Sequence, residues 1–303
     1  MDEQINSLIE RTTNFTKKLE TKYPKNIVYL LNVIIPAFII KYGYREERKI
    51  LKIFEEVPLF IREDPNSNST AYFARSIVND GKDFSSIKEI VIQKYQNSSL
   101  AELLDSIIHE YNHAINSWEN EFKEDDKYLY MRTGLSYIVY DKLDFSSREE
   151  AINLTLEEII NTRQTETIID IIRELASKNI TNDALKESLD FLHSHIRPAY
   201  KSNAYLLQTT LSKKLIENRS FLPSLERLRY SGHIEDIAPW FDEITGEKNS
   251  FNKLSKLLDL VIKKEQDLYS SKFFINHKIR KIKTLINQID ELIDLYDQNS
   301  IYK

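Results

Sequence analysis

The stretch IIHEYNHAIN, residues 107–116, places His109 and His113 four positions apart, with Glu110 directly after the first histidine. Four residues make just over one turn of an α-helix, so both imidazoles are expected on the same helical face. That spacing is suited to holding a metal ion between two neutral imidazoles. The alternative is two surface histidines on an amphipathic helix.

The neighbouring sequence predicts the helix that would carry this stretch. Ser99 and Glu102 have the spacing of a capping box, which marks a helix start. Apolar and aromatic residues then recur at helical intervals, namely Leu104, Ile108, Tyr111, Ile115 and Trp118. Upstream, EIVIQKY (89–95) is the clearest strand, with Ile90 and Ile92 on one face.

The composition favours long helices and excludes several classes of site. The 303-residue chain has only 5 glycines and 7 prolines, few turn formers for its length. It has no cysteine, so disulfides and thiolate metal sites are excluded, and any zinc must be held by His, Asp or Glu. A net charge of -5 without a basic stripe gives no reason to expect a nucleic-acid partner.

The N-terminal region predicts a cytoplasmic protein without a membrane segment. Its first residues are polar and acidic, unlike a secretory signal. The apolar run IVYLLNVIIPAFII (27–40) is shorter than the roughly 20 residues of a membrane span, and Asn32 and Pro36 interrupt it. A buried helix bent at Pro36 is the preferred interpretation.

The pattern along the chain predicts a mostly helical α+β fold. Residues 1–56 form an N-terminal helical segment with breaks near KYPKN and Gly43, 57–180 a domain with a small sheet, and 181–303 a helical C-terminal region. Within these, 128–141 is a strand or hairpin candidate and 155–175 an amphipathic helix. Residues 231–250 are predicted to be an ordered loop and 251–296 a helical hairpin.

Through IIHEYNHAIN the sequence resembles the zincin metallopeptidases. The resemblance implies a zincin-like metal-binding domain over 57–180, with His109 and His113 as Zn²⁺ ligands and Glu110 as general base on zinc-bound water. It also implies a peptide or protein substrate that pairs with a sheet edge beside the zinc helix. The metzincin branch is disfavoured, because it needs a glycine and a histidine where this chain has Asn116 and Glu119.

The gluzincin branch takes its third ligand from a later helix, and LEEIINTRQTE (156–166) resembles that element. Laid on the aminopeptidase-type pattern, Glu158 is the ligand, and Thr162 and Thr165 share its helical face. Two alternatives stay open. In one, Glu157 is the ligand; in the other, Glu158 only caps its helix in a capping box with Thr155.

The resemblance also implies a donor that stabilises the oxyanion, typically Tyr, His or Arg. We expect His233 or Tyr200 in this role, ahead of Tyr137, Tyr140, Arg132 and the pair His193 and His195.

The expected function is therefore that of a zinc-dependent metallopeptidase. The alternatives are a non-catalytic zincin-fold regulatory or interaction protein, and a zinc hydrolase of a non-peptide amide. The sequence specifies neither the substrate nor the oligomeric state.

Overall fold

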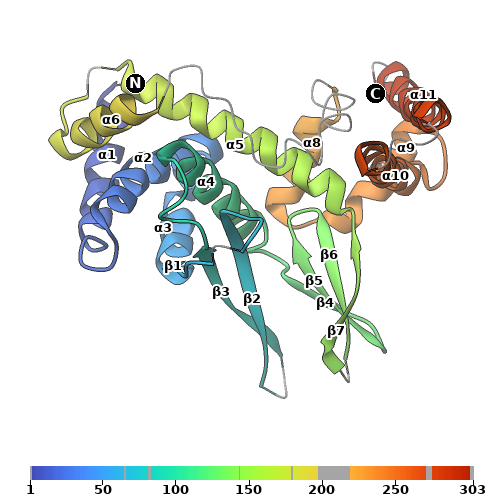
Figure 1. Cartoon of the computed structure of the whole chain (residues 1–303), viewed down its shortest axis with the longest axis horizontal. Helices are drawn as coiled ribbons and strands as arrows, with labels where there is room; N and C mark the ends of the chain where they lie inside the picture. Colours follow the sequence, from blue (N-terminus) through green and yellow to red (C-terminus); the bar gives the residue numbers. More distant parts are fainter. Residues whose placement is uncertain are drawn as a thin grey trace. The chain divides into compact units, whose positions relative to one another are not determined.

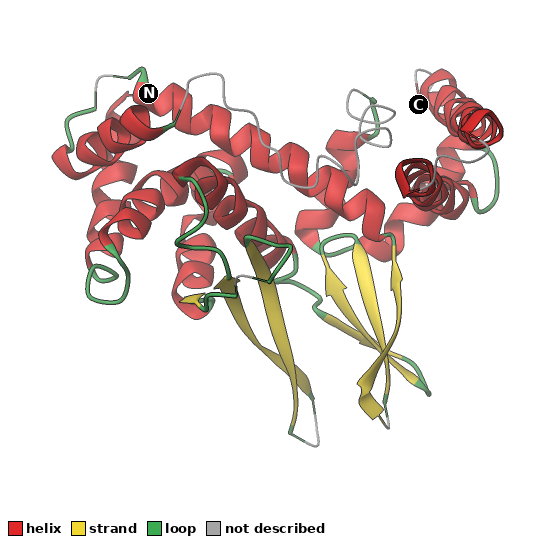
Figure 2. Ribbon diagram, in the orientation of Figure 1, coloured by secondary structure: helices red, strands yellow, loops and turns green. Residues whose placement is uncertain are grey.

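A computed structural model describes residues 2–64, 66–80, 83–142, 144–178, 180–196, 219–270 and 275–300. These residues form a mostly helical α+β fold with two small sheets (Figures 1 and 2). Contacts divide the chain into two units, Met1–Ile115 with Gln164–Ala204, and Asn116–Arg163 with Tyr205–Lys303. Each unit thus combines two separate stretches, whereas the sequence predicts three consecutive ones. The difference arises because helix α5 (Leu154–Ala176) belongs partly to each unit.

The two breaks predicted in the N-terminal segment are confirmed, because one helix of the first unit begins within KYPKN and ends directly before Gly43. The helices of this unit are α1 (Asp2–Lys17), α2 (Lys25–Tyr42), the short 3-10 helix η1 (Tyr44–Glu46), α3 (Glu47–Glu56), α4 (Leu100–Asn116) and α6 (Asp183–His195). Helices α1, α2 and α6 pack together (Figure 1). Gly43, at φ 102°, ends α2 in a conformation that few other residues adopt.

Helix α2 is long and apolar enough to cross a membrane by length and composition, yet 67% of its apolar window is buried inside the structure. Its polar residue Asn32 is buried as well, and it makes hydrogen bonds with helices on either side. The Asn32 amide donates to Ser188 Oγ at 3.1 Å, and the Thr16 hydroxyl donates to Asn32 Oδ1. These contacts satisfy a polar group that would be costly to bury alone. The helix continues through Pro36.

The first unit holds a sheet of β1 (Leu59–Ile61), β2 (Ala71–Asn79) and β3 (Phe84–Ile92) in the order β1–β3–β2. Strand β1 is parallel to β3, and β2 is antiparallel to it, so β2 lies at an edge. The prediction of a strand over 89–95 is wrong in its limits, since β3 begins at Phe84 and ends at Ile92. Ile90, Val91 and Ile92 are all fully buried, so both faces are covered at this end of the strand.

The second unit holds an antiparallel sheet in the order β4–β5–β6–β7 (Figure 2). Its strands are β4 (Phe122–Glu124), β5 (Tyr128–Thr133), β6 (Ser136–Asp141) and β7 (Asp144–Ile152). The hairpin predicted over 128–141 is confirmed by β5 and β6, with Gly134 at φ 57° in the turn.

The helices of the second unit are α8 (Leu222–Ser231), η2 (Ile234–Asp236), α9 (Ile237–Thr245), α10 (Ser250–Ser270) and α11 (Ile275–Ser300). The predicted C-terminal helical hairpin is confirmed by α10 and α11. The prediction of a loop over 231–250 is wrong, because helix α9 occupies the centre of this segment. Ile237 and Phe241, one turn apart, are buried in a core with Phe221 and Tyr296, and Gly246 at φ 72° ends the helix.

Candidate metal centre

Helix α4 carries the two histidines, and its start is fixed by the predicted capping box. The Ser99 backbone N–H donates to the Glu102 carboxylate at 2.7 Å, and the Glu102 N–H donates to Ser99 Oγ at 3.2 Å. Two backbone donors that the helix itself cannot satisfy thus gain partners. The capping-box prediction is confirmed.

The apolar face of α4 is anchored by Tyr111, inside the motif. Its hydroxyl donates to the Val57 carbonyl at 3.0 Å, and its ring lies 3.9 Å from that of Phe54 in α3. Burial raises the pKa of Tyr111 well above its usual value, so this phenol stays neutral. Tyr111 therefore fixes the rotation of α4 about its axis, and with it the direction of the histidine face.

The side chains of His109 and His113 meet on that face. Their Nε2 atoms lie 3.1 Å apart, and the imidazole planes are inclined at 77°. The residues are 1% and 5% exposed, so they are not surface histidines, and that alternative is wrong. Two imidazoles whose Nε2 atoms converge can share one proton or bind one cation.

Glu158, on α5, completes a group of potential ligands. The group takes one ligand atom from each of His109, His113 and Glu158, and these three atoms lie within 4.8 Å of one another. Thr155 lies inside α5, which begins at Leu154, so it does not occupy the cap position that a capping box with Glu158 requires. Thr162, one turn later, donates to the Glu158 carbonyl at 2.8 Å.

Glu157 points to a different set of partners. Its carboxylate accepts hydrogen bonds from both Nε and Nη2 of Arg229, and the Nε bond is 2.8 Å long. The Leu135 backbone N–H donates to the same carboxylate at 2.7 Å. Glu157 and Arg229 are both fully buried. The structure thus engages Glu157 in a buried ion pair within the second unit.

A buried polar network adjoins the histidine face within the first unit. Asn112, between the two histidines in sequence, donates to Thr165 Oγ1 at 3.2 Å. The Tyr42 hydroxyl lies 3.2 Å from Asn112 Oδ1 and 3.3 Å from Gln164 Oε1, so it can donate to either. These bonds link α4 to the second half of α5 and to the end of α2. The prediction that Thr165 lies on the ligand side of α5 is consistent with this contact.

Glu110 is held by the edge strand of the first sheet. The backbone N–H of Phe73 in β2 donates to Glu110 Oε2 at 2.8 Å, and Glu110 is 5% exposed. The Gln93 N–H donates to the Thr70 carbonyl at 2.8 Å, so Thr70 and every second residue after it form the hydrogen bonds between β2 and β3. Phe73 and every second residue after it therefore direct their backbone groups away from β3.

The expected oxyanion donors that the structure describes have surroundings of their own. Tyr200 lies outside the described residues. The imidazole of His233 is 57% exposed, and its Nδ1 lies 3.6 Å from the Glu235 carboxylate. His195 and His193 are exposed at the end of α6. Tyr137 packs against the core of the second unit.

Arg132, another of the expected oxyanion donors, forms hydrogen bonds with backbone carbonyls. Its guanidinium donates to the backbone carbonyls of Gly134 at 2.9 Å and Arg229 at 3.1 Å, and also to those of Asn116 and Glu119.

We call Arg132, Arg229 and Glu157 the arginine clamp. Sequence reasoning missed it, although one signal was present. Leu222, Leu225 and Arg229 recur at core spacing in α8, and a charge at such a position indicates a buried ion pair.

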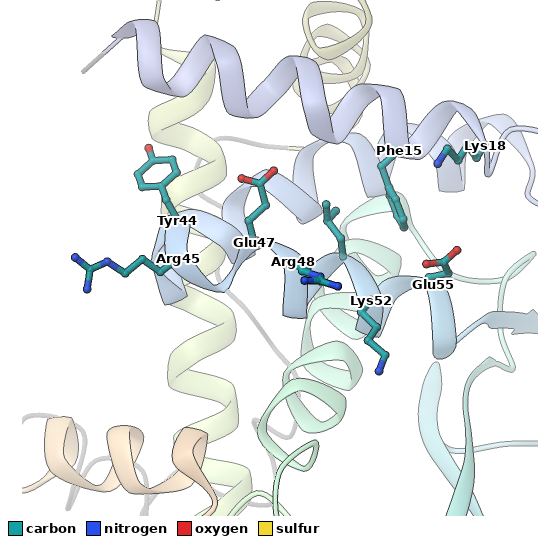
Figure 3. Close-up of a pocket in the computed structure, with 9 residues that line it drawn as sticks. Phe15, Lys18, Tyr44, Arg45, Glu47, Arg48, Lys52 and Glu55 are labelled. Atoms are coloured by element: carbon teal, nitrogen blue, oxygen red, sulfur yellow. The ribbon is translucent and has the colours of Figure 1, made fainter.

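Two surface hollows of the first unit are lined by other residues. One, of about 530 Å³, lies between α1 and α3 (Figure 3) and is lined by Phe15, Lys18, Tyr44, Arg45, Glu47, Arg48, Leu51, Lys52 and Glu55. Its charges are mixed, and Figure 3 shows Arg45 and Lys52 pointing in different directions, so the cations do not converge. The other, of about 400 Å³, is mainly apolar and lies beside α5 and α6.

No protein-family model, no curated protein and no solved structure matches the chain.

Proposed function

We propose that the protein is a zinc-dependent metallopeptidase with His109, His113 and Glu158 as metal ligands and Glu110 as general base. The observation that carries this proposal is the convergence of three ligand atoms within 4.8 Å, two from the histidines of α4 and one from Glu158 of α5. Glu110, in the same motif, accepts a hydrogen bond from the Phe73 backbone, and we assign it the role of base rather than ligand.

The donor set suits zinc. Two Zn–N bonds of about 2.0–2.1 Å at a tetrahedral angle would put the nitrogens about 3.3 Å apart. The Nε2 atoms of His109 and His113 lie 3.1 Å apart, close to that separation. Two imidazoles and one carboxylate would make three protein ligands, the number that is typical of a catalytic rather than a structural zinc site.

When bound, zinc would supply a Lewis acid for a carbonyl group and would acidify a water molecule. Glu110 would take the proton from the attacking water and return it to the leaving amine. The Phe73 N–H donates to Oε2 of this carboxylate at 2.8 Å and helps to orient it.

The edge of β2 provides a place for an extended substrate. Phe73 lies next to Glu110, and the backbone groups of Arg75 and Ile77 point away from β3 in the same alternation. An extended peptide adds to such an edge by backbone hydrogen bonds, largely independently of its side chains. This supports a peptide or protein substrate over a small amide.

One observation favours the second candidate, a non-catalytic zincin-like protein that binds metal for regulation or interaction. His109, Glu110 and His113 are 1%, 5% and 5% exposed, and turnover requires that a substrate reach them. The two candidates share the metal site and differ in the role of Glu110.

The Glu110→Gln variant separates them. The variant should bind zinc as the wild type does, because Glu110 is not a ligand, and should lose hydrolysis by orders of magnitude. A broad peptide library, with zinc content measured on the same samples, provides both readouts. Equal cleavage by both proteins would remove Glu110 as the base. Cleavage by neither, with zinc bound to both, would favour the regulatory candidate.

A further inference from the structure

The arginine clamp holds α5 at two successive turns. Arg229 reaches the carboxylate of Glu157 and, at 2.7 Å, the side-chain oxygen of Asn161, four residues later. A guanidinium that bonds two positions one turn apart fixes the rotation of the helix about its axis. Glu158 follows Glu157 and projects about 100° further round. Any rotation that released Glu157 would therefore swing Glu158 through the same angle.

The turn between β5 and β6 closes around the Glu157 carboxylate. A Cβ atom placed on Gly134 would overlap both oxygens of that carboxylate, and Gly134 adopts φ +57°. Glycine is therefore required at this position for two reasons: its backbone adopts a positive φ, and a side chain would collide with the Glu157 carboxylate. The Leu135 N–H, next in sequence, is one of the donors to Glu157. The carboxylate is thus held by backbone as well as by Arg229.

The clamp also reaches the end of the other ligand-bearing helix. Arg132 donates to the carbonyl of Asn116, the last residue of α4, and to the carbonyl of Arg229. A cation at a helix C-terminus binds carbonyls that the helix leaves without partners. Asn116 lies three residues after His113. A continuous hydrogen-bonded path therefore runs from the end of α4 through two arginines to Glu157 on α5.

Stability alone is a weak reason for such an arrangement. Burying charged groups costs several kcal/mol of desolvation per ion, and well-packed apolar residues often replace a buried pair without loss. Arg132, Arg229 and Glu157 are all 0% exposed. Apolar residues could not replace these charges if their role is to fix an orientation. A bidentate ion pair holds its two side chains in one relative orientation, which apolar packing does less strictly.

We infer that the arginine clamp is a positioning device for the metal centre, which sets the rotation of α5 so that Glu158, and not Glu157, faces His109 and His113. The inference rests on the proposed function, since it assigns Glu158 the role of metal ligand. Arg132, Arg229 and Glu157 touch neither metal nor substrate in this arrangement. They act through Glu158.

The test is zinc affinity of the full-length chain, measured by competition with a chelator at a temperature where every variant is folded. The double substitution Glu157→Met with Arg229→Met removes one negative and one positive charge together, so neither partner of this ion pair is left buried without the other. We expect it to stay folded and to bind zinc at least 10-fold more weakly than the wild type. Cobalt(II), whose visible absorption depends on coordination geometry, should show an altered spectrum in the same variant.

A matched control lies on the same two helices. Arg163 of α5 and Glu226 of α8 form a partly exposed ion pair of 3.2 Å, and Glu226→Gln breaks it without touching the clamp. This control should bind zinc as the wild type does. Equal weakening by the control would overturn the inference, because any loosening of α5 against α8 would then be sufficient.

Arg229→Lys keeps the charge but not the fork, and it covers the case in which the double variant does not fold. It should also bind zinc more weakly, since one ammonium group cannot hold Glu157 and Asn161 in the same geometry. Wild-type affinity in either folded variant would overturn the inference while the proposed function stands. Absence of zinc binding by the wild type would overturn both.

Discussion

Two consecutive glutamates on α5 belong to two polar clusters of different composition. Glu157 meets Arg229, a backbone N–H and the turn at Gly134, so its negative charge is balanced by groups of the protein. Glu158 lies with the imidazoles of His109 and His113, which bring lone pairs rather than a fixed positive charge. The comparison teaches that the first cluster contains its own cation, whereas the second brings together the kinds of donor atom that bind zinc.

The largest effect should come from disrupting the first cluster. Arg229→Ala leaves Glu157 as a buried carboxylate without its cation, and we expect a loss of about 3–5 kcal/mol in the free energy of unfolding. Denaturant unfolding followed by circular dichroism measures it. Glu226→Gln, which breaks the partly exposed pair with Arg163, should cost no more than about 1 kcal/mol. Similar losses in both variants would show that burial does not distinguish these ion pairs.

The second cluster should respond in metal binding rather than in stability. Glu158→Ala removes a ligand, so zinc affinity should fall by more than the 10- to 100-fold typical of residues behind the ligands. Its unfolding free energy without metal should change little, because Glu158 is only partly buried. A chelator competition assay and metal-free unfolding curves give the two values. A variant that lost stability but kept its zinc affinity would reverse the contrast between the two glutamates.

A smaller effect should come from the turn beside the first cluster. Gly134→Ala introduces a Cβ against the Glu157 carboxylate at φ +57°, and we expect a loss of about 1–3 kcal/mol. Gly246→Ala is the control, since Gly246 has φ +72° and nothing within 4 Å of an added Cβ. It should show only the backbone strain, about 1 kcal/mol. The thermal unfolding midpoints of the two variants measure this difference. A larger loss of stability in Gly246→Ala than in Gly134→Ala would contradict the role given to the Glu157 carboxylate.

The sequence was informative wherever local periodicity decides the outcome. The four-residue spacing of His109 and His113 predicted a shared face, and their Nε2 atoms lie 3.1 Å apart. The cap at Ser99 and the hairpin over 128–141 likewise follow from short-range patterns. The same reasoning favoured Glu158 over Glu157 only weakly, because both faces of α5 are polar.

Features that depend on distant residues could not be predicted in this way. The partner of Glu157 is Arg229, 72 residues later, and no local pattern specifies that pairing. The division into two units depends on the contacts of both halves of α5. Helix α9 is short and has Pro239 in its first turn and Gly246 directly after its end, so its local sequence does not distinguish it from a loop. The role expected of Tyr200 lies outside the described residues and stays a prediction.

Zinc content of the purified full-length protein tests the metal centre most directly. After exposure to zinc and removal of excess metal, the wild type should carry about one zinc per chain, since His109, His113 and Glu158 form one convergent site. His113→Ala should carry none, because it removes one of two imidazoles whose Nε2 atoms face each other. Stoichiometric zinc retained by His113→Ala, or none bound by the wild type, would contradict the assignment.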